Sequence, residues 1–229
     1  MMENLTEFHA RVDSFQRDSL QSTLTTKPLL VEKVAPDGGL RPFFGNTMIF
    51  DLPADVQLQI ARMQLMLHHR CAEMLAQPLA PATLHMTLHD LLNGVDADAL
   101  AAPVTQTGAQ AKAILAELRA ADLPPIHLTS TLAFNMTNGS VALGFAPDTE
   151  ADCAAIMGMH SRFQDVVALN YPLTPHVTLG YYKPGSYGTA ALAEVLQSIN
   201  ALEKVHITVD AACLHYYRFT DMNTYIQEA

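Results

Sequence analysis

Residues 84–88 read Leu-His-Met-Thr-Leu, and residues 175–179 read Pro-His-Val-Thr-Leu. Each stretch is a His-x-Thr triplet followed by leucine, and the apolar neighbours are typical of a β-strand. Side chains two residues apart in a strand point to the same face, so His85 and Thr87 project together, as do His176 and Thr178. Two imidazoles and two hydroxyls are suited to holding a phosphate and moving protons on either side of it.

The elements around the two triplets follow the same order in each half of the chain: a strand, a long helix, the His-x-Thr strand and a second helix. This duplicated order predicts two lobes around a cleft, with one triplet from each lobe. Asp148 is expected to cap the helix of the second half. Strands are expected at residues 46–52, 83–92, 126–136, 141–145, 173–182 and within 205–219, and helices at residues 56–74, 103–121, 156–167 and 192–199.

The composition is that of a globular protein with a full hydrophobic core. Apolar residues make up 49% and charged residues 16% of the 229 residues, which suffice for one large domain or two small lobes. No stretch approaches the roughly 20 apolar residues of a membrane span. Residues 1–10 lack the basic and apolar regions of a secretory signal. We therefore expect a cytoplasmic protein without a membrane partner.

The first forty residues differ in pattern from the rest of the chain. Apolar residues from Leu5 to Phe15 recur at helical spacing and predict a short amphipathic helix. The regular alternation of strands and helices begins only after this segment. We interpret residues 1–40 as an N-terminal extension that packs on a single bilobal domain at residues 41–229.

The charge balance favours a small ligand. The net charge is −10, with 13 basic and 23 acidic residues, whereas proteins that bind long nucleic acids gather lysine and arginine on one face. A small nucleotide needs only a local pocket. The three cysteines, Cys71, Cys153 and Cys213, are too far apart in sequence to indicate a disulfide framework or a zinc-thiolate site.

The paired triplets, their separation of 91 residues and the duplicated order of elements resemble the 2H phosphoesterase superfamily, which is named for two His-x-Thr/Ser motifs. The resemblance covers Gly45 to about Tyr225. Two further strings, Arg-Pro-Phe-Phe-Gly-Asn-Thr at residues 41–47 and Phe-Thr-Asp-Met-Asn at residues 219–223, are similar to stretches in a poorly characterised branch, a DUF1868-like domain family of unknown function.

The superfamily resemblance implies a two-lobed, pseudo-twofold α+β fold in which antiparallel sheets line a central cleft and helices lie outside. It also implies that the reactive group of the substrate is a phosphodiester or cyclic phosphate, and that no metal or other cofactor takes part. The chain is thus interpreted as a metal-independent phosphodiesterase, a hydrolase that acts on a small nucleotide, a cyclic phosphate or an RNA-end phosphodiester. The oligomeric state stays open.

Two histidines can divide the proton transfers of phosphodiester cleavage. One neutral imidazole deprotonates the attacking oxygen, and one imidazolium protonates the leaving oxygen, because the unperturbed histidine pKa of about 6.5 lies near neutral pH. Thr87 and Thr178 would donate hydrogen bonds to the phosphoryl oxygens, where charge accumulates. The pseudo-symmetry leaves open whether His85 or His176 is the acid.

Three further residues are candidates for substrate binding. In a regular strand Tyr182 shares the face of His176, so it would flank the phosphate or stack on a base, with a supporting cross-strand aromatic as the equal alternative. Asn46 and Thr47 follow a glycine at the start of a strand, so their polar groups would line the cleft. Turn and strand-start roles explain these two residues equally well.

His89 extends the first triplet to His-x-Thr-x-His, and it shares the face of His85 if the strand is regular. Asp90 would then face the other way. Because no acidic or cysteine partner lies at ligand spacing on that face, we interpret His89 as a rim or core residue and expect no metal site.

Two alternatives to catalysis stay open. The chain would be a non-catalytic nucleotide-binding module of the same fold if a nucleotide binds without reaction. It would be an α+β interaction protein if both histidines are structural. The geometry discriminates the last alternative, because structural histidines would lie on separate surfaces, whereas a working pair must reach one phosphate.

Overall fold

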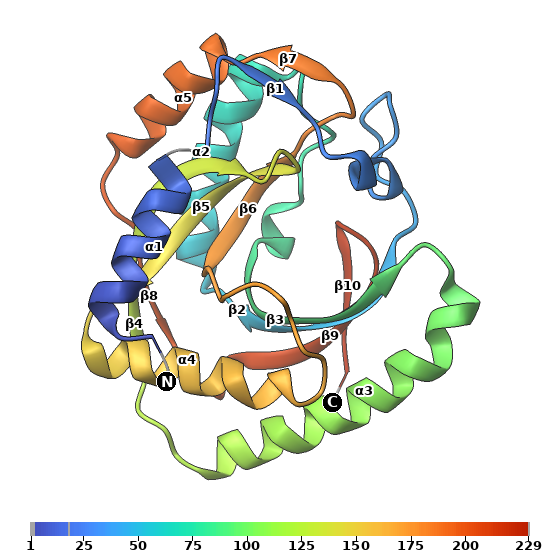
Figure 1. Cartoon of the computed structure of the whole chain (residues 1–229), viewed down its shortest axis with the longest axis vertical. Coiled ribbons are helices and arrows are strands. Elements are labelled where there is room, and N and C mark those ends of the chain that lie inside the picture. The colour runs from blue at the N-terminus through green and yellow to red at the C-terminus, as the bar shows by residue number, and fades with distance from the viewer. Residues whose placement is uncertain (1–2, 18, 229) are drawn as a thin grey trace.

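The computed structural model describes residues 3–17 and 19–228. Residues 1–2 and 18 of the expected extension, and residue 229 of the expected domain, lie outside the described part. Two four-stranded sheets dominate the fold, and every pairing within them is antiparallel. Figure 1 shows the sheets curving around a central space, with helices along the outside.

Each sheet has one of the His-x-Thr strands at its edge. The first sheet has the order β10 (Thr224–Gln227), β9 (Leu214–Asp221), β2 (Phe44–Asp51) and β3 (His85–Gly94). The second sheet has the order β8 (His206–Val209), β4 (Ile126–Met136), β5 (Ser140–Pro147) and β6 (His176–Tyr181). The edge strands β3 and β6 contact each other where the sheets meet.

The two sheets are related as pseudo-twofold copies. In each, the edge strand with the triplet pairs with a neighbour that precedes it by one long helix: α2 (Ala54–Cys71) joins β2 to β3, and α4 (Glu150–Gln164) joins β5 to β6. The expected two-lobed, pseudo-twofold α+β fold with antiparallel sheets around a cleft is therefore confirmed. The pattern of strands and helices predicted the order of elements and the two lobes, and the superfamily resemblance implied the antiparallel sheets around the cleft.

The helices cover the sheets on their outer sides and link the lobes (Figure 1). Helix α3 (Ala97–Ala120) packs against β2, β3 and β9, and α5 (Ala190–Asn200) packs against β4 and α2. Helix α2 also contacts β6, and α4 contacts β3. Each of these two helices therefore contacts the triplet strand of the opposite lobe. A small sheet pairs β1 (Thr23–Thr25) with β7 (Ser186–Gly188), and short 3-10 turns form η1 (Pro28–Glu32) and η2 (Pro81–Thr83).

Helix α1 (Leu5–Arg17) packs on a strand face made of small residues. On β5 this face carries Ala142, Gly144 and Ala146, and the whole strand is buried. Phe8 and Val12 of α1 form a compact apolar cluster with Ala146 there. Small side chains allow the helix to approach the sheet closely, so the predicted amphipathic helix lies directly against the second lobe.

The face that α1 covers is the one that carries His176. Gly144 is the partner of His176 in the β5–β6 register, and paired residues of antiparallel strands point to the same side of the sheet. A Cβ on Gly144 would lie 2.1 Å from Nε2 of Gln16, the buried residue near the end of α1. The N-terminal helix therefore forms one wall beside the second triplet.

Two helix starts differ from the expectation. Helix α3 begins at Ala97 and not at Pro103, because the Asp96 carboxylate caps it by accepting hydrogen bonds from two backbone N–H groups of the first turn. Helix α4 is capped by Thr149 and not by Asp148, since Thr149 and Asp152 form a reciprocal capping box. Both helices thus begin directly after the residue whose side chain accepts a hydrogen bond from the N–H groups of the first turn.

Among the described residues, no helix has the length and apolar character to cross a membrane.

Candidate active site

The cleft between the two lobes contains a pocket of about 530 Å³, and all four side chains of the two triplets line it. His85 and Thr87 reach it from β3, and His176 and Thr178 reach it from β6. All four are half-buried, so they remain accessible to a small ligand. The structure therefore brings together residues from opposite halves of the chain, and it does not place the histidines on separate surfaces.

The two histidines make matching hydrogen bonds. Nδ1 of His85 lies 2.7 Å from the carbonyl oxygen of Thr83, and Nδ1 of His176 lies 2.7 Å from the carbonyl oxygen of Thr174. A carbonyl oxygen only accepts, so each Nδ1 carries the hydrogen and donates it. In the neutral ring Nε2 is then the unprotonated nitrogen, which is the atom that can take up a proton.

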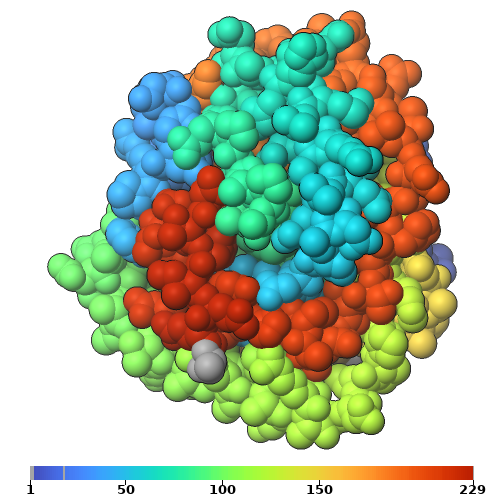
Figure 2. All heavy atoms as spheres, turned by 180° about the vertical axis from the view of Figure 1, so that it is seen from behind, coloured from blue at the N-terminus to red at the C-terminus, as the bar shows by residue number. Residues whose placement is uncertain are grey.

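The segment that carries the Thr83 carbonyl is held by the C-terminal hairpin. The side-chain oxygen of Asn223, in the turn between β9 and β10, accepts hydrogen bonds from the backbone N–H of Ala80 at 2.8 Å and from the hydroxyl of Thr83 at 2.9 Å. Figure 2 shows the C-terminal strands, in red, against the green segment that precedes β3. The C-terminus thus supports the first histidine.

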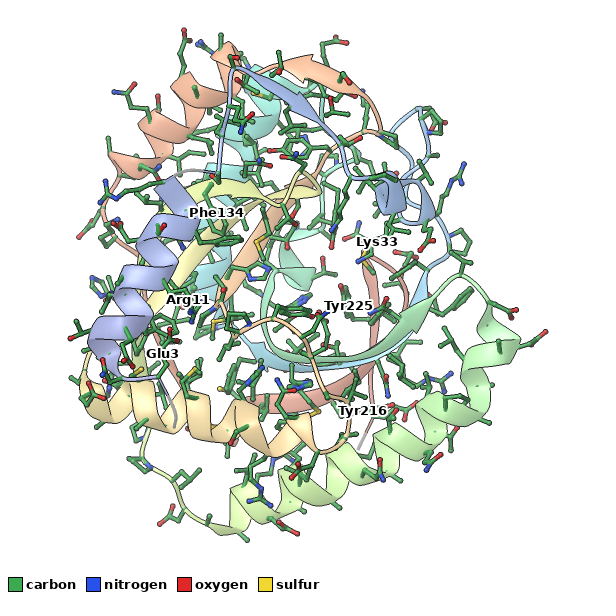
Figure 3. All side chains as sticks on the ribbon, in the orientation of Figure 1. Glu3, Arg11, Lys33, Phe134, Tyr216 and Tyr225 are labelled. Carbon is green, nitrogen blue, oxygen red and sulfur yellow. The ribbon has the colours of Figure 1, made fainter. Side chains whose placement is uncertain are left out.

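The segment that carries the Thr174 carbonyl is held by the N-terminal helix. Arg11 of α1 donates hydrogen bonds to the carbonyl oxygen of Leu173 at 2.9 Å and to the hydroxyl of Thr174 at 3.2 Å. A bidentate ion pair with Glu3, at 2.8 and 2.7 Å, fixes the guanidinium (Figure 3). Arg11 therefore positions the loop that carries the acceptor of His176, and the sequence pattern contained no sign of this role.

Both triplet strands contain a β-bulge at the leucine after the threonine. In the first sheet Thr87 pairs with Ile49, and the next pairing joins His89 to Met48, so Leu88 has no partner of its own. An extra residue in one strand shifts its alternation by one position. Asp90, five positions after His85, consequently lines the pocket.

The second strand repeats this irregularity at the equivalent position. Thr178 pairs with Ala142, and the next pairing joins Gly180 to Val141, which leaves Leu179 without a partner. The residue five positions after His176 is Tyr181, and it too lines the pocket. The pseudo-symmetry therefore extends to the bulges, and it places a carboxylate in one lobe opposite a phenol in the other.

The bulges correct two expectations based on regular strands. Tyr182 does not line the pocket: its side chain is 0% exposed and belongs to the main hydrophobic core, while its neighbour Tyr181 occupies the pocket position. Asp90 does not face away but lines the pocket, where its carboxylate accepts a hydrogen bond from the Tyr171 hydroxyl at 3.1 Å. Strict alternation fails because each bulge adds one residue to the strand, so the residues after it point to the opposite face from the one that regular alternation predicts.

His89 is a core residue and lies at the inner wall of the pocket. It is 1% exposed, and its ring packs against that of His160 from α4, with 4.9 Å between the ring centroids. Burial lowers the pKa of His89, and it lowers that of His160 to about 4. Both rings are therefore neutral near pH 7. The residues that the structure describes contain no group of three or more His, Cys, Asp or Glu side chains placed to hold a metal ion.

The two polar residues at the start of β2 have structural partners. Asn46 is 1% exposed and does not line the pocket, because its amide donates to Thr107 at 3.0 Å and to the Tyr216 hydroxyl at 3.1 Å. The structure thus places the Asn46 side chain among buried partners and outside the pocket lining. Thr47 does line the pocket, but its hydroxyl donates to the carbonyl oxygen of His89 at 3.1 Å.

The environment of the two triplet histidines favours their neutral forms. Burial is the main cause that lowers the pKa of His85 and that of His176. His176 lowers the pKa of His85 further by charge repulsion, whereas Asp90 acts on both rings in the opposite direction. Tyr225 of β10 packs edge-on against His85 with 4.7 Å between ring centroids, which contributes to this burial.

Solved structures with the same fold include a conserved protein of unknown function from Agrobacterium tumefaciens, with a TM-score of 0.64 and 17% sequence identity over 96% of this chain and 97% of that chain. Another is E. coli LigT in complex with 3′-AMP, with a TM-score of 0.51 and 14% identity over 82% of this chain and 97% of that chain. No protein-family model and no curated protein matches the sequence significantly. At these identities the similarity establishes the fold: this chain is a bilobal α+β protein with the architecture of LigT.

Proposed function

We propose that this chain is a metal-independent phosphodiesterase that cleaves a small nucleotide, a cyclic phosphate or an RNA-end phosphodiester by two-histidine acid–base catalysis. The observation that carries this proposal is the matched pair of imidazoles, each oriented through Nδ1, in one pocket with two threonine hydroxyls. The strings at residues 41–47 and 219–223 support a place in the 2H phosphoesterase superfamily and its DUF1868-like branch as part of the same proposal.

The proposed reaction balances its protons between the two rings. The neutral histidine takes a proton from water through Nε2 as the water oxygen attacks phosphorus, and a bond from oxygen to phosphorus forms. The bond from phosphorus to the leaving oxygen breaks, and the protonated histidine gives its Nε2 proton to that oxygen. Thr87 and Thr178 donate to the non-bridging oxygens as their charge increases. Each ring ends in the state in which the other began.

The size and charge of the molecule support a small substrate. A pocket of about 530 Å³ is within the range of small-molecule sites, about 300 to 1,000 Å³. The net charge of −10 opposes the binding of a long polyanion. E. coli LigT, which shares the fold, was crystallised with 3′-AMP, and this supports a nucleotide as the ligand.

The test is hydrolysis of nucleoside 2′,3′-cyclic monophosphates by the purified chain in EDTA, followed by chromatography of the products. We expect turnover to a nucleoside monophosphate that persists when the chelator is in excess. Loss of turnover in EDTA, with recovery on adding a divalent ion, would contradict the metal-independent mechanism. Tight binding of nucleotides without any product would instead favour the non-catalytic nucleotide-binding module.

We expect kcat/KM to reach its maximum below pH 6.5. Catalysis needs one protonated and one neutral imidazole in the free enzyme, and both pKa values are lowered from 6.5, mainly by burial. As pH rises through the higher of the two values, the acid loses its proton, and kcat/KM should fall about tenfold per pH unit. A profile from about pH 4 to about pH 9 at constant ionic strength measures this. A maximum in kcat/KM on the alkaline side of neutrality would contradict the assignment of these two rings.

A further inference from the structure

The lysine and arginine side chains among the described residues of the pocket lining all come from the N-terminal segment. Among the described residues, the lysines and arginines that line the pocket are Arg11, Lys27 and Lys33, and the only carboxylate that lines it is Asp90. The other described parts of the chain, from residue 34 to residue 228, contribute no lysine or arginine to this lining. In a protein with a net charge of −10, this segment makes the pocket locally positive.

Two of these three cations, Arg11 and Lys27, are less suited than Lys33 to bind a ligand anion inside the pocket. Arg11 is engaged by Glu3 and by the loop before β6, as described above. Lys27 is exposed, and it lies beside Gly139 of the β4–β5 turn at the rim. The charge of Arg11 is paired, and that of Lys27 is exposed to solvent, which screens it. Lys33 is therefore the side chain that decides what the positive end of the pocket binds.

Lys33 has a half-buried ammonium group without an acidic partner. Its Nζ lies 4.6 Å from the centroid of the Phe43 ring and 6.0 Å from that of Tyr181, and no carboxylate of the described residues forms a salt bridge with it. Aromatic faces attract a cation more weakly than a carboxylate does. Burial lowers the pKa of Lys33, and an anion beside Nζ would offset that cost.

The backbone around Lys33 is held rigidly. Its N–H donates to the carbonyl oxygen of Leu30 at 3.0 Å, and its carbonyl oxygen accepts from the N–H of Arg41 at 2.9 Å. The next residue, Val34, is 0% exposed and belongs to the main core. A fixed backbone reduces the entropy lost when the side chain binds a ligand, so the site is pre-organised.

The contacts of Lys33 are with aromatic rings of the pocket. Its ammonium lies over Phe43 and near Tyr181, the pocket residue that follows Thr178 along β6 after the bulge. In Figure 3 the labelled Lys33 lies on the η1 side of the cleft, and Arg11 lies on the α1 side. An anion that Lys33 binds on its side of the cleft can be a different group of the ligand from the phosphate at the histidines.

We propose that Lys33 forms a second anion subsite, which selects nucleotide substrates that carry a phosphate besides the phosphodiester to be cleaved. This inference rests on the proposed function and names its substrate class. The N-terminal segment then determines specificity, while the triplets perform the chemistry. A charge-assisted hydrogen bond from a half-buried ammonium to a phosphate is expected to improve affinity about tenfold.

The test compares two nucleotides that differ by one phosphate. Isothermal calorimetry measures the Kd of adenosine 3′-monophosphate and of adenosine 3′,5′-bisphosphate for the wild-type chain. We expect the bisphosphate to bind about tenfold more tightly. Lys33→Met should abolish most of this preference, Lys33→Arg should retain it, and Lys112→Met should also retain it. Lys112 is the matched control because it lies on α3 outside the pocket and its loss changes the net charge equally.

Equal affinity of the wild type for both nucleotides would overturn the subsite, as would failure to bind either one. A preference that survives in Lys33→Met would overturn it too, because Lys33 would not be its source. These measurements need no turnover. Hydrolysis of adenosine 2′,3′-cyclic monophosphate in EDTA, followed in parallel, tests the phosphodiesterase separately, so the two proposals can fail independently.

Discussion

Replacement of His176 or His85 by alanine is expected to lower kcat for a cyclic nucleotide by about 10² to 10⁴-fold in each case. Each ring supplies one of the two proton transfers, and the other two histidines of the pocket lining, His89 and His160, pack against each other. The effects should be strongly non-additive, since loss of either transfer stops the same concerted step. The double variant should therefore be little slower than the slower single variant.

The matched control for these substitutions is His69→Ala. His69 is exposed on α2, lies outside the pocket, and makes no side-chain hydrogen bond among the described residues. It should turn over substrate at the wild-type rate. Thermal unfolding of all the variants separates chemistry from folding, because within the described residues the side chain of each triplet histidine makes a single hydrogen bond, to a carbonyl. Wild-type turnover in either His85→Ala or His176→Ala would reject the acid–base pair.

Gly45→Ala is expected to destabilise the protein by about 3 kcal/mol, because the neighbouring strand leaves no space for a Cβ. A Cβ at this position would lie 2.2 Å from the carbonyl oxygen of Leu92 and 3.0 Å from Cα of Asn93, both of which are backbone atoms of β3. It would also lie 2.5 Å from Cζ of Phe219. A side chain can rotate away from a clash, but a paired backbone has to move as a whole.

Thermal unfolding measures this effect, and the expected loss corresponds to a Tm lower by roughly 10 °C for a chain of this size. Gly158→Ala is the matched control. Gly158 lies inside α4 with no atom within 4 Å of an added Cβ, so the change should raise stability by about 1 kcal/mol through helix propensity. An unchanged Tm in Gly45→Ala would show that β2 and β3 do not approach as closely as the structure has them.

Strand faces beyond the triplets were the main error of sequence reasoning. Period-two alternation placed His85 with Thr87, but the same rule placed Asp90 outside the pocket and Tyr182 inside it. A bulge depends on how many residues the partner strand offers, and that strand is about forty residues away in the chain. The two leucines after the triplets contain no local signal of it.

The sequence pattern also did not predict the role of the N-terminal segment in the pocket. Its amphipathic helix was predictable from spacing, because helical periodicity is a property of neighbouring residues. The side on which that helix lies was not predictable. It depends on Gly144 and the other small residues of β5, which admit α1 beside His176 and so bring Arg11 into the site. Lys33 reaches the pocket through similar long-range packing.

The sequence by itself determined the order of strands and helices, the two lobes and the pairing of each histidine with its threonine, since all of these follow from short-range periodicity and from one motif that occurs twice. Which other side chains line the pocket depends on the tertiary structure. The pocket lining includes Asp90, Tyr181, Arg11 and Lys33, whereas Asn46 and Tyr182 are buried outside it. The cause is the distance along the chain over which each feature is determined. The face to which a strand residue points depends on adjacent residues, whereas a bulge or a helix contact depends on atoms that only folding brings together.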